Sequence, residues 1–155
     1  MTEQLVKRST VIHLNGMPDA VFPLFTPVGE YKWIPGWQPE LIYPPSGEAM
    51  TNNVFATRHA GRDRTIWVTV DYDPEAYHAE YVNITPGFQS TRIEIQCRAA
   101  DGGTEARVTH TLIAIGEAGY AEVEKYTEAA HAAHIGHWET AINYYLAHGS
   151  AIPTL

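Results

Sequence analysis

Residues 117–148 contain no proline and carry apolar side chains at helical spacing, and this feature constrains the fold most. With residues placed at about 100° each and His134 as the reference, an apolar stripe forms within about 40° of it. Lys125, Glu139 and Asn143 lie on the opposite side. One continuous amphipathic helix over Glu117–His148 is therefore predicted, and its stripe must cover another element. The stripe contains Tyr120, Val123, Thr127, Ala130, Trp138, Ala141, Tyr145 and His148.

Prolines are concentrated near the other end of the chain, where seven of the ten fall between Pro18 and Pro45. Proline interrupts both helix interiors and central strands. In "NGMPDAVFPLFTPVGEYKWIPGW", Asn15 is a cap-like residue and Pro18 suits an early helical position, while the following prolines limit the run. This segment is predicted to form two short helices with a kink between them.

Turn signals separate stretches rich in β-forming residues between these two regions: "PPSGE", "AGRDR", "DYDPEA", "ITPGF" and "ADGGTE". Alternation is clearest in "STRIEIQCRA", where Thr91, Ile93, Ile95 and Cys97 share one face. Short turns join neighbouring antiparallel strands. With "VKRSTVIHL" near the start, these stretches predict an antiparallel sheet of about seven strands. The stretches are residues 41–44, 54–59, 65–72, 77–84, 89–99 and 104–115.

Composition narrows the class of protein. A length of 155 residues suits one domain, expected here over residues 1–155. The formal charge of −8 repels phosphate backbones and anionic lipid surfaces, so nucleic acid is not an expected partner. Neither a signal-type apolar run nor a stretch long enough to span a membrane appears, which favours a cytoplasmic protein. The lone Cys97 excludes an intrachain disulfide and is expected to be a small buried hydrophobe. A homodimer is left open.

Four motifs resemble the SRPBCC superfamily, which includes START domains, birch-pollen-allergen-like proteins and polyketide cyclases. They are "AVFPLF", "WIPGW", "DGGTEARVTHT" and "HWETAINYYLAHG", in an order and spacing that cover nearly the whole chain. The resemblance implies an α+β helix-grip fold, in which a curved antiparallel sheet wraps around a long C-terminal helix and leaves an apolar cavity. It does not fix function, because the superfamily carries lipids, cyclises polyketides, forms oxygenase subunits and activates chaperones on one scaffold.

Three histidines spaced three apart raise the question of a metal site in "EAAHAAHIGHWETAINYYLAHG". His131 and His137 lie about 60° to either side of His134 on the helical wheel, so one ion would not easily reach both. Catalytic zinc usually takes three protein ligands, and no HExxH motif or nearby cysteine set is present. Neither a metal site nor a cofactor is predicted.

The central histidine of that run has two open interpretations. His134 is either a core histidine bonded to a backbone carbonyl or Tyr hydroxyl, or a polar group presented to the cavity for orientation or proton transfer. His131 and His137 are expected to flank it in partly exposed positions.

A fourth histidine is expected on the opposing wall. In "ARVTHTLIA", Val108, His110, Leu112 and Ala114 occupy the less polar face of a strand, directed toward the terminal helix. Two polar groups that converge in an apolar pocket suit an orienting or acid/base site. The alternative is a buried His–His or His–Tyr hydrogen bond without a ligand.

Aromatic residues complete the expected cavity wall, although core packing alone would explain any one of them. Trp33 and Trp37 flank "IPG", where the resemblance places a cavity mouth, and Phe55, Thr57 and His59 share a strand face. Trp67 alternates with Ile66, Val68 and Val70 and is expected outside the cavity, whereas the face of Tyr81 is ambiguous. The predicted ligand-binding residues are Trp33, Trp37, Phe55, His59, Tyr81, His110, His134, Trp138 and Tyr145.

Three functions remain open at the level of sequence. The first is binding of a mostly apolar small molecule, such as a lipid, isoprenoid or polyketide-like compound, in the cavity. The second is a cyclase or dehydratase that uses the histidines as acid and base, although no Ser-His-Asp order, phosphate loop or paired-carboxylate motif specifies a reaction. The third is a chaperone-binding activator that uses the outer surface.

Overall fold

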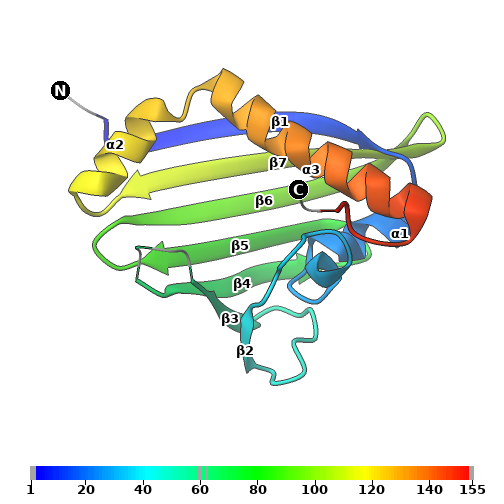
Figure 1. The fold of residues 1–155 in the computed structure, drawn as a ribbon, viewed down its shortest axis with the longest axis horizontal. Helices are drawn as coiled ribbons and strands as arrows, with labels where there is room; N and C mark the ends of the chain where they lie inside the picture. Colours follow the sequence, from blue (N-terminus) through cyan, green and yellow to red (C-terminus); the bar gives the residue numbers. More distant parts are fainter. Residues whose placement is uncertain (1–2, 59–60, 62, 154–155) are drawn as a thin grey trace.

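The chain folds into one curved antiparallel sheet with a long helix across its face, as a computed structural model covering residues 3–58, 61 and 63–153 shows (Figure 1). The strand order is β1-β7-β6-β5-β4-β3-β2. The strands are β1 Leu5–Leu14, β2 Glu40–Tyr43, β3 Val54–Thr57, β4 Thr65–Asp73, β5 His78–Thr85, β6 Gln89–Ala100 and β7 Gly103–Ala114. The helical segments are α1 Pro18–Val21, η1 Phe22–Phe25, η2 Gly29–Lys32, α2 Glu117–Lys125 and α3 Glu128–His148. The predicted helix-grip fold is confirmed.

The inner face of the sheet follows the predicted alternation in its two longest strands. On β6, Thr91, Ile93, Ile95 and Cys97 are buried, and on β7 the same holds for Val108, His110, Leu112 and Ala114. Burial raises the pKa of the Cys97 thiol to about 12, so this residue is a small core hydrophobe, as expected. Several inner residues of these two strands therefore pack in one core with Ile135 and Ile142 of α3, a helix that runs closest to β1.

The C-terminal helical region differs from the prediction because it contains two helices. Tyr126 leaves helical geometry with φ −83° and ψ 69°, and Thr127 then begins α3 as its N-cap. The Thr127 hydroxyl accepts a hydrogen bond from the Ala130 N–H at 3.1 Å, which satisfies one of the free donors of the first turn. A single helix over Glu117–His148 was therefore wrong, and the residues of α2 cannot be placed on the same helical wheel as those of α3.

The buried stripe of α3 consequently has a different centre. His131, Ile135 and Ile142 are the buried residues of the helix, whereas His134 is exposed at the edge of the stripe. His131 was expected to be partly exposed, and its full burial overturns that expectation.

Two residues that the wheel placed on the far side of the helix instead attach α3 to the edge strand β1. The Glu139 carboxylate accepts a hydrogen bond from the His13 N–H at 2.7 Å. The Asn143 side chain accepts from the Asn15 N–H at 2.8 Å and donates to the His13 carbonyl at 3.0 Å. These bonds satisfy backbone groups that an edge strand otherwise leaves unpaired.

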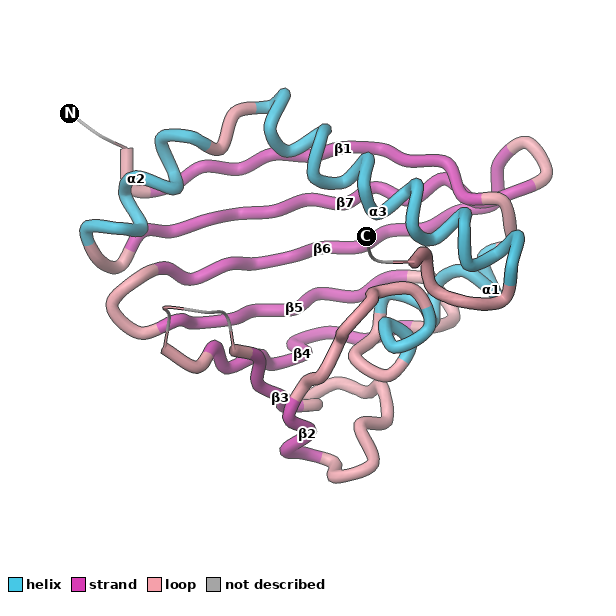
Figure 2. Tube along the Cα trace, in the orientation of Figure 1, coloured by secondary structure: helices cyan, strands magenta, loops and turns pink. Residues whose placement is uncertain are grey.

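The short helices lie near the C-terminal end of α3 (Figure 2). Their packing depends on Gly29, because a Cβ at that position would lie 1.9 Å from the Pro23 carbonyl oxygen. The glycine therefore allows η2 to rest directly on the preceding segment. Phe22 and Leu24 fill the core beneath them. Within the described part of the chain, none of the helices is long and apolar enough to cross a membrane.

Candidate functional site

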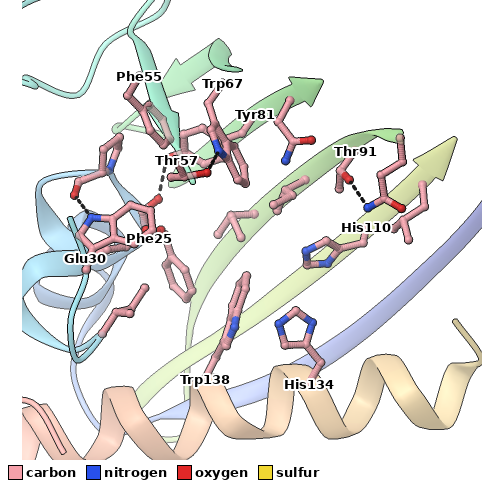
Figure 3. A pocket seen from close by; sticks show the side chains of 18 of the residues that line it. Phe25, Glu30, Phe55, Thr57, Trp67, Tyr81, Thr91, His110, His134 and Trp138 are labelled. Atoms are coloured by element: carbon pink, nitrogen blue, oxygen red, sulfur yellow. Dashed lines mark hydrogen bonds between the residues drawn. The ribbon is translucent and has the colours of Figure 1, made fainter. Parts of the chain in front are cut away.

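A cavity of about 410 Å³ lies between the sheet, α3 and the segment 25–37 (Figure 3). Its walls are mainly aromatic and aliphatic, as is usual for small-molecule sites. The lining residues are Phe25, Pro27, Glu30, Trp33, Ile34, Trp37, Phe55, Thr57, Trp67, Tyr81, Asn83, Gln89, Thr91, Ile93, Ile95, His110, Leu112, Glu122, Tyr126, His134 and Trp138.

One end of the cavity is an aromatic wall. Phe55 and Trp67 are register partners on β3 and β4, and their rings stack at 5.4 Å with only 9° between their planes. The expectation that Trp67 lies outside was wrong. Ile66 and Val68 face outward although they are apolar, so polarity along β4 does not reveal which face is covered.

The indole and phenol donors of this aromatic end are already bonded within the protein. The Trp33 indole N–H donates to the Leu24 carbonyl at 2.7 Å, and the Trp37 indole donates to the Pro27 carbonyl at 2.8 Å. Trp67 donates to the Thr57 hydroxyl at 2.9 Å. The Tyr81 hydroxyl donates to the Phe25 carbonyl at 2.7 Å. These four residues therefore offer a ligand apolar surface rather than free hydrogen-bond donors.

The opposite end is built around His110 on β7 and His131 on α3. The His110 Nδ1 and His131 Nε2 atoms are 3.0 Å apart, and the second nitrogen of His131, Nδ1, lies 2.7 Å from the Thr10 hydroxyl on β1. Figure 3 shows the His110 ring opposite Trp138 and His134 of α3, whose ring centroids lie 5.7 and 5.8 Å from its own. The buried His–His bond that the sequence left open is present, but it involves His131 rather than His134.

Burial keeps these imidazoles neutral near pH 7. Desolvation lowers the pKa of His110 to about 3, with the neighbouring His131 and His134 adding to the shift. Desolvation also lowers the pKa of His131 to about 4, assisted by His134 and Arg8. A neutral imidazole carries one ring hydrogen and one acceptor nitrogen, so each ring has a defined polarity.

The amino-acid sequence matches a known protein family over most of its length. Residues 6–142 match the family model described as polyketide cyclase / dehydrase and lipid transport. This chain belongs to that family. No curated protein sequence matches it. The SRPBCC resemblance inferred from the motifs is thereby confirmed.

Solved structures share the fold of this polyketide cyclase / dehydrase and lipid transport family member at low sequence identity. Ara h 8.0201 is 17% identical with a TM-score of 0.64, and the match covers 92% of this chain and 98% of that one. Norcoclaurine synthase from Thalictrum flavum, in complex with dopamine and hydroxybenzaldehyde, is 12% identical with a TM-score of 0.65, covering 92% and 87%. DynU16, from the dynemicin biosynthetic locus, is 15% identical with a TM-score of 0.63, covering 96% of this chain and 49% of that one. These TM-scores show that the chains share a fold.

The histidine at the edge of the cavity, His134, has a looser environment than His110. Its Nδ1 lies 3.5 Å from the Tyr126 hydroxyl, the limit of a hydrogen bond, and its side chain is exposed. Desolvation lowers its pKa, with His137 contributing. Burial raises the pKa of Tyr126 to about 12. His134 therefore lines the cavity from its rim rather than from the centre of a buried stripe.

A carboxyl group that the sequence prediction missed also lines the cavity. Desolvation raises the pKa of Glu30 to about 8, so this group is mostly protonated at neutral pH. It lies in η2 directly after Gly29, and in its ionised form it contributes to the raised pKa of Tyr81. Its position between apolar residues of a proline-rich segment is the signal that could have identified it.

Most predicted site residues do line the cavity: Trp33, Trp37, Phe55, Tyr81, His110, His134 and Trp138. Tyr145 does not, because it packs against the hydrophobic core farther along α3. His59 lies outside the described residues. Among the residues that the structure describes, no group of three or more His, Cys, Asp or Glu is arranged to hold a metal ion.

Proposed function

We propose that this protein binds one mostly apolar small molecule, such as a lipid, isoprenoid or polyketide-like compound, in the cavity between the sheet and α3. The observation that carries the proposal is the aromatic wall whose indole and phenol donors are already bonded to the protein. Such a wall contributes apolar contact without leaving polar groups unpaired when a ligand excludes water.

The comparisons support the same kind of ligand. The description of the family includes lipid transport and polyketide chemistry. One structure of the same fold was determined with two small aromatic compounds, dopamine and hydroxybenzaldehyde. A cavity of about 410 Å³ falls within the range typical of small-molecule sites.

Native mass spectrometry of the untagged protein, with and without 2-acetylnaphthalene, tests this proposal. We expect one small molecule per chain, either retained from the cell or accepted from solution. The variant Leu112→Trp, which places a large ring in the cavity, should abolish this binding. Ile113→Trp is the matched control, because residue 113 is 38% exposed on the other face of the same strand. Equal binding by both variants, or none by the wild type, would overturn the proposal.

A second candidate is an enzyme of cyclase or dehydratase type that uses the same cavity. The observation in its favour is that two imidazoles, His110 and His134, flank one end of the cavity with their ring centroids 5.8 Å apart. A positioned acid or base contributes about 10²–10⁴-fold to a rate. If the protein turns over its bound molecule, His110→Gln should lower kcat by that factor while binding persists. Unchanged turnover would exclude His110 as the acid or base.

A further inference from the structure

We propose that Thr10 and His131 hold His110 in the tautomer whose Nε2–H points into the cavity, so that the bound molecule carries an oxygen acceptor, such as a ketone, ester or quinone carbonyl. This inference rests on the proposed function, because it names the class of ligand for the same cavity. His110 would contact the ligand, whereas His131 and Thr10 are positioning residues.

The hydrogen bonds of His131 restrict the position of its ring hydrogen. Its side chain is 0% exposed, and both ring nitrogens are used: Nδ1 toward the Thr10 hydroxyl at 2.7 Å and Nε2 toward His110 Nδ1 at 3.0 Å. Since neutral His131 has one ring hydrogen, the hydrogens of this chain of three side chains must all point the same way. Only two arrangements satisfy both bonds.

In the first arrangement, the Thr10 hydroxyl donates to His131 Nδ1, and the His131 Nε2–H donates to His110 Nδ1. His110 must then carry its own hydrogen on Nε2. That nitrogen has no hydrogen-bond partner within the described residues, and His110 is part of the cavity wall. The cavity is thereby given an N–H donor.

In the second arrangement, every hydrogen is reversed and His110 Nε2 becomes an acceptor for a ligand hydroxyl or amine. The Thr10 hydroxyl would then accept from His131 and have to donate its hydrogen elsewhere. Across residues 3–58, 61 and 63–153, no other acceptor is bonded to that hydroxyl. Once a ligand acceptor lies on His110 Nε2, the first arrangement leaves no donor of the three side chains unpaired. The second arrangement also requires a solvent partner for the half-buried Thr10 hydroxyl, and for this reason the first is the one assigned.

The surroundings favour neutral rings. The titratable or charged groups around the pair are His134 and Tyr126 from the helical side and Arg8 from β1, with Glu122 on the same cavity wall. None of the described carboxylates is hydrogen-bonded to His110 or His131. Desolvation lowers both pKa values, so the two rings remain neutral near pH 7.

NMR of the ligand-free, ¹⁵N-labelled protein tests the tautomers directly, because protonated and unprotonated ring nitrogens resonate at different frequencies. At pH 7 we expect His110 and His131 both to carry hydrogen on Nε2. Thr10→Val should convert both rings to a mixture of tautomers, while Thr10→Ser keeps the wild-type pattern. Ser9→Ala is the matched control, since its hydroxyl bonds Thr109 on the other face of the sheet at 3.0 Å. A hydrogen on His110 Nδ1, or an imidazolium, would overturn the proposal.

Two probes of similar shape then test the class of ligand: 2-acetylnaphthalene and 2-isopropenylnaphthalene, which replaces the carbonyl oxygen by a methylene group. The wild type should bind the ketone about 2- to 10-fold more tightly, as expected for one neutral hydrogen bond. Thr10→Val should reduce this preference and Thr10→Ser restore it. Equal affinities in the wild type would overturn the carbonyl assignment with the cavity intact, whereas binding of neither probe would remove the proposed function together with it.

Discussion

The two ends of the cavity differ in how their polar atoms are used. At the aromatic end, Trp33, Trp67 and Tyr81 all donate to other groups of the protein. At the histidine end, the chain from Thr10 through His131 stops at His110, whose Nε2 has no partner among the described residues. Hydrogen bonds at the first end therefore fix the shape of the wall, and those at the second end set the polarity of one ring atom in the proposed ligand site.

The largest expected effect concerns the aromatic end. Trp33 is 3% exposed and bonded to the Leu24 carbonyl, and truncation of a buried tryptophan typically costs about 3–5 kcal/mol. Trp33→Ala should lower the free energy of unfolding, measured by urea denaturation, by that amount. Tyr31→Ala is the control, because Tyr31 is 48% exposed in η2, the short helix directly before Trp33, and its truncation should cost less than about 0.5 kcal/mol. Similar losses for the two variants would mean that Trp33 is not part of a fixed wall.

The next largest effect is the pH dependence of stability, which has opposite signs at the two ends of the cavity. His110 and His131 have lowered pKa values of about 3 and 4 and protonate near 6.5 when unfolded, so their contribution to stability is lost as the pH falls below 6.5. Glu30, with a raised pKa of about 8, works in the opposite direction: its contribution is present at low pH and is lost as the pH rises toward 8.

As the pH falls from 6.5 to 5, His110 and His131 should each lower the free energy of unfolding by about 2 kcal/mol. Glu30 should raise it by about 2 kcal/mol, so the net loss of stability is about 2 kcal/mol. Glu30→Gln removes the opposing contribution and should make the decline steeper, and His110→Phe should make it shallower. Unfolding free energies measured by urea denaturation across this range give both slopes. A profile that neither variant alters would contradict the assigned burial of these groups.

The two ends of the cavity also differ in how well the sequence predicted their residues. The outer faces of β6 and β7 are mainly polar, so the alternation of polar and apolar residues identified their inner residues, including His110. On β4 the outer face is apolar as well, and Trp67 was assigned to the wrong side. Periodicity identifies a covered face only where the other face is polar.

The histidine chain escaped prediction for a different reason. A wheel drawn through residues 117–148 treats them as one helix, whereas Thr127 caps a new one. With Thr127 recognised as a cap, His131 would have fallen four residues into a separate helix whose buried stripe continues through Ile135 and Ile142. The bond between His131 and Thr10 joins residues 121 positions apart, and no local pattern specifies such a contact.

A substitution with a smaller effect should give the aromatic end an unbonded polar group, like the one at the histidine end. Trp67→Phe keeps a ring against Phe55 but removes the N–H that bonds the Thr57 hydroxyl, leaving that hydroxyl free in the cavity. The cost in stability should be about 1 kcal/mol, as for one neutral hydrogen bond. The ketone preference over the alkene should also change, because a second polar group becomes available. Phe55→Leu, which alters the stack without releasing a polar group, is the control, and an identical ketone preference in both variants would argue against bonded donors as the distinguishing feature.

The smallest effect is expected at His134. Its side chain is exposed and its contact with Tyr126 is 3.5 Å long, so His134→Gln should change stability and ketone affinity by less than about 0.5 kcal/mol. His110→Gln, compared with His134→Gln by fluorescence titration with 2-acetylnaphthalene, should have the larger effect on affinity. The reverse order would place the ligand oxygen at the rim of the cavity instead of at its buried wall.

The most direct measurement is the orientation of bound 2-acetylnaphthalene, from intermolecular nuclear Overhauser effects. We expect contacts from the naphthyl protons to Phe55 and Trp67, and from the acetyl methyl group to side chains beside His110. The ¹⁵N resonance of His110 Nε2 should shift on binding. An acetyl group located beside Glu30 and Tyr81, with His110 unaffected, would contradict this expectation.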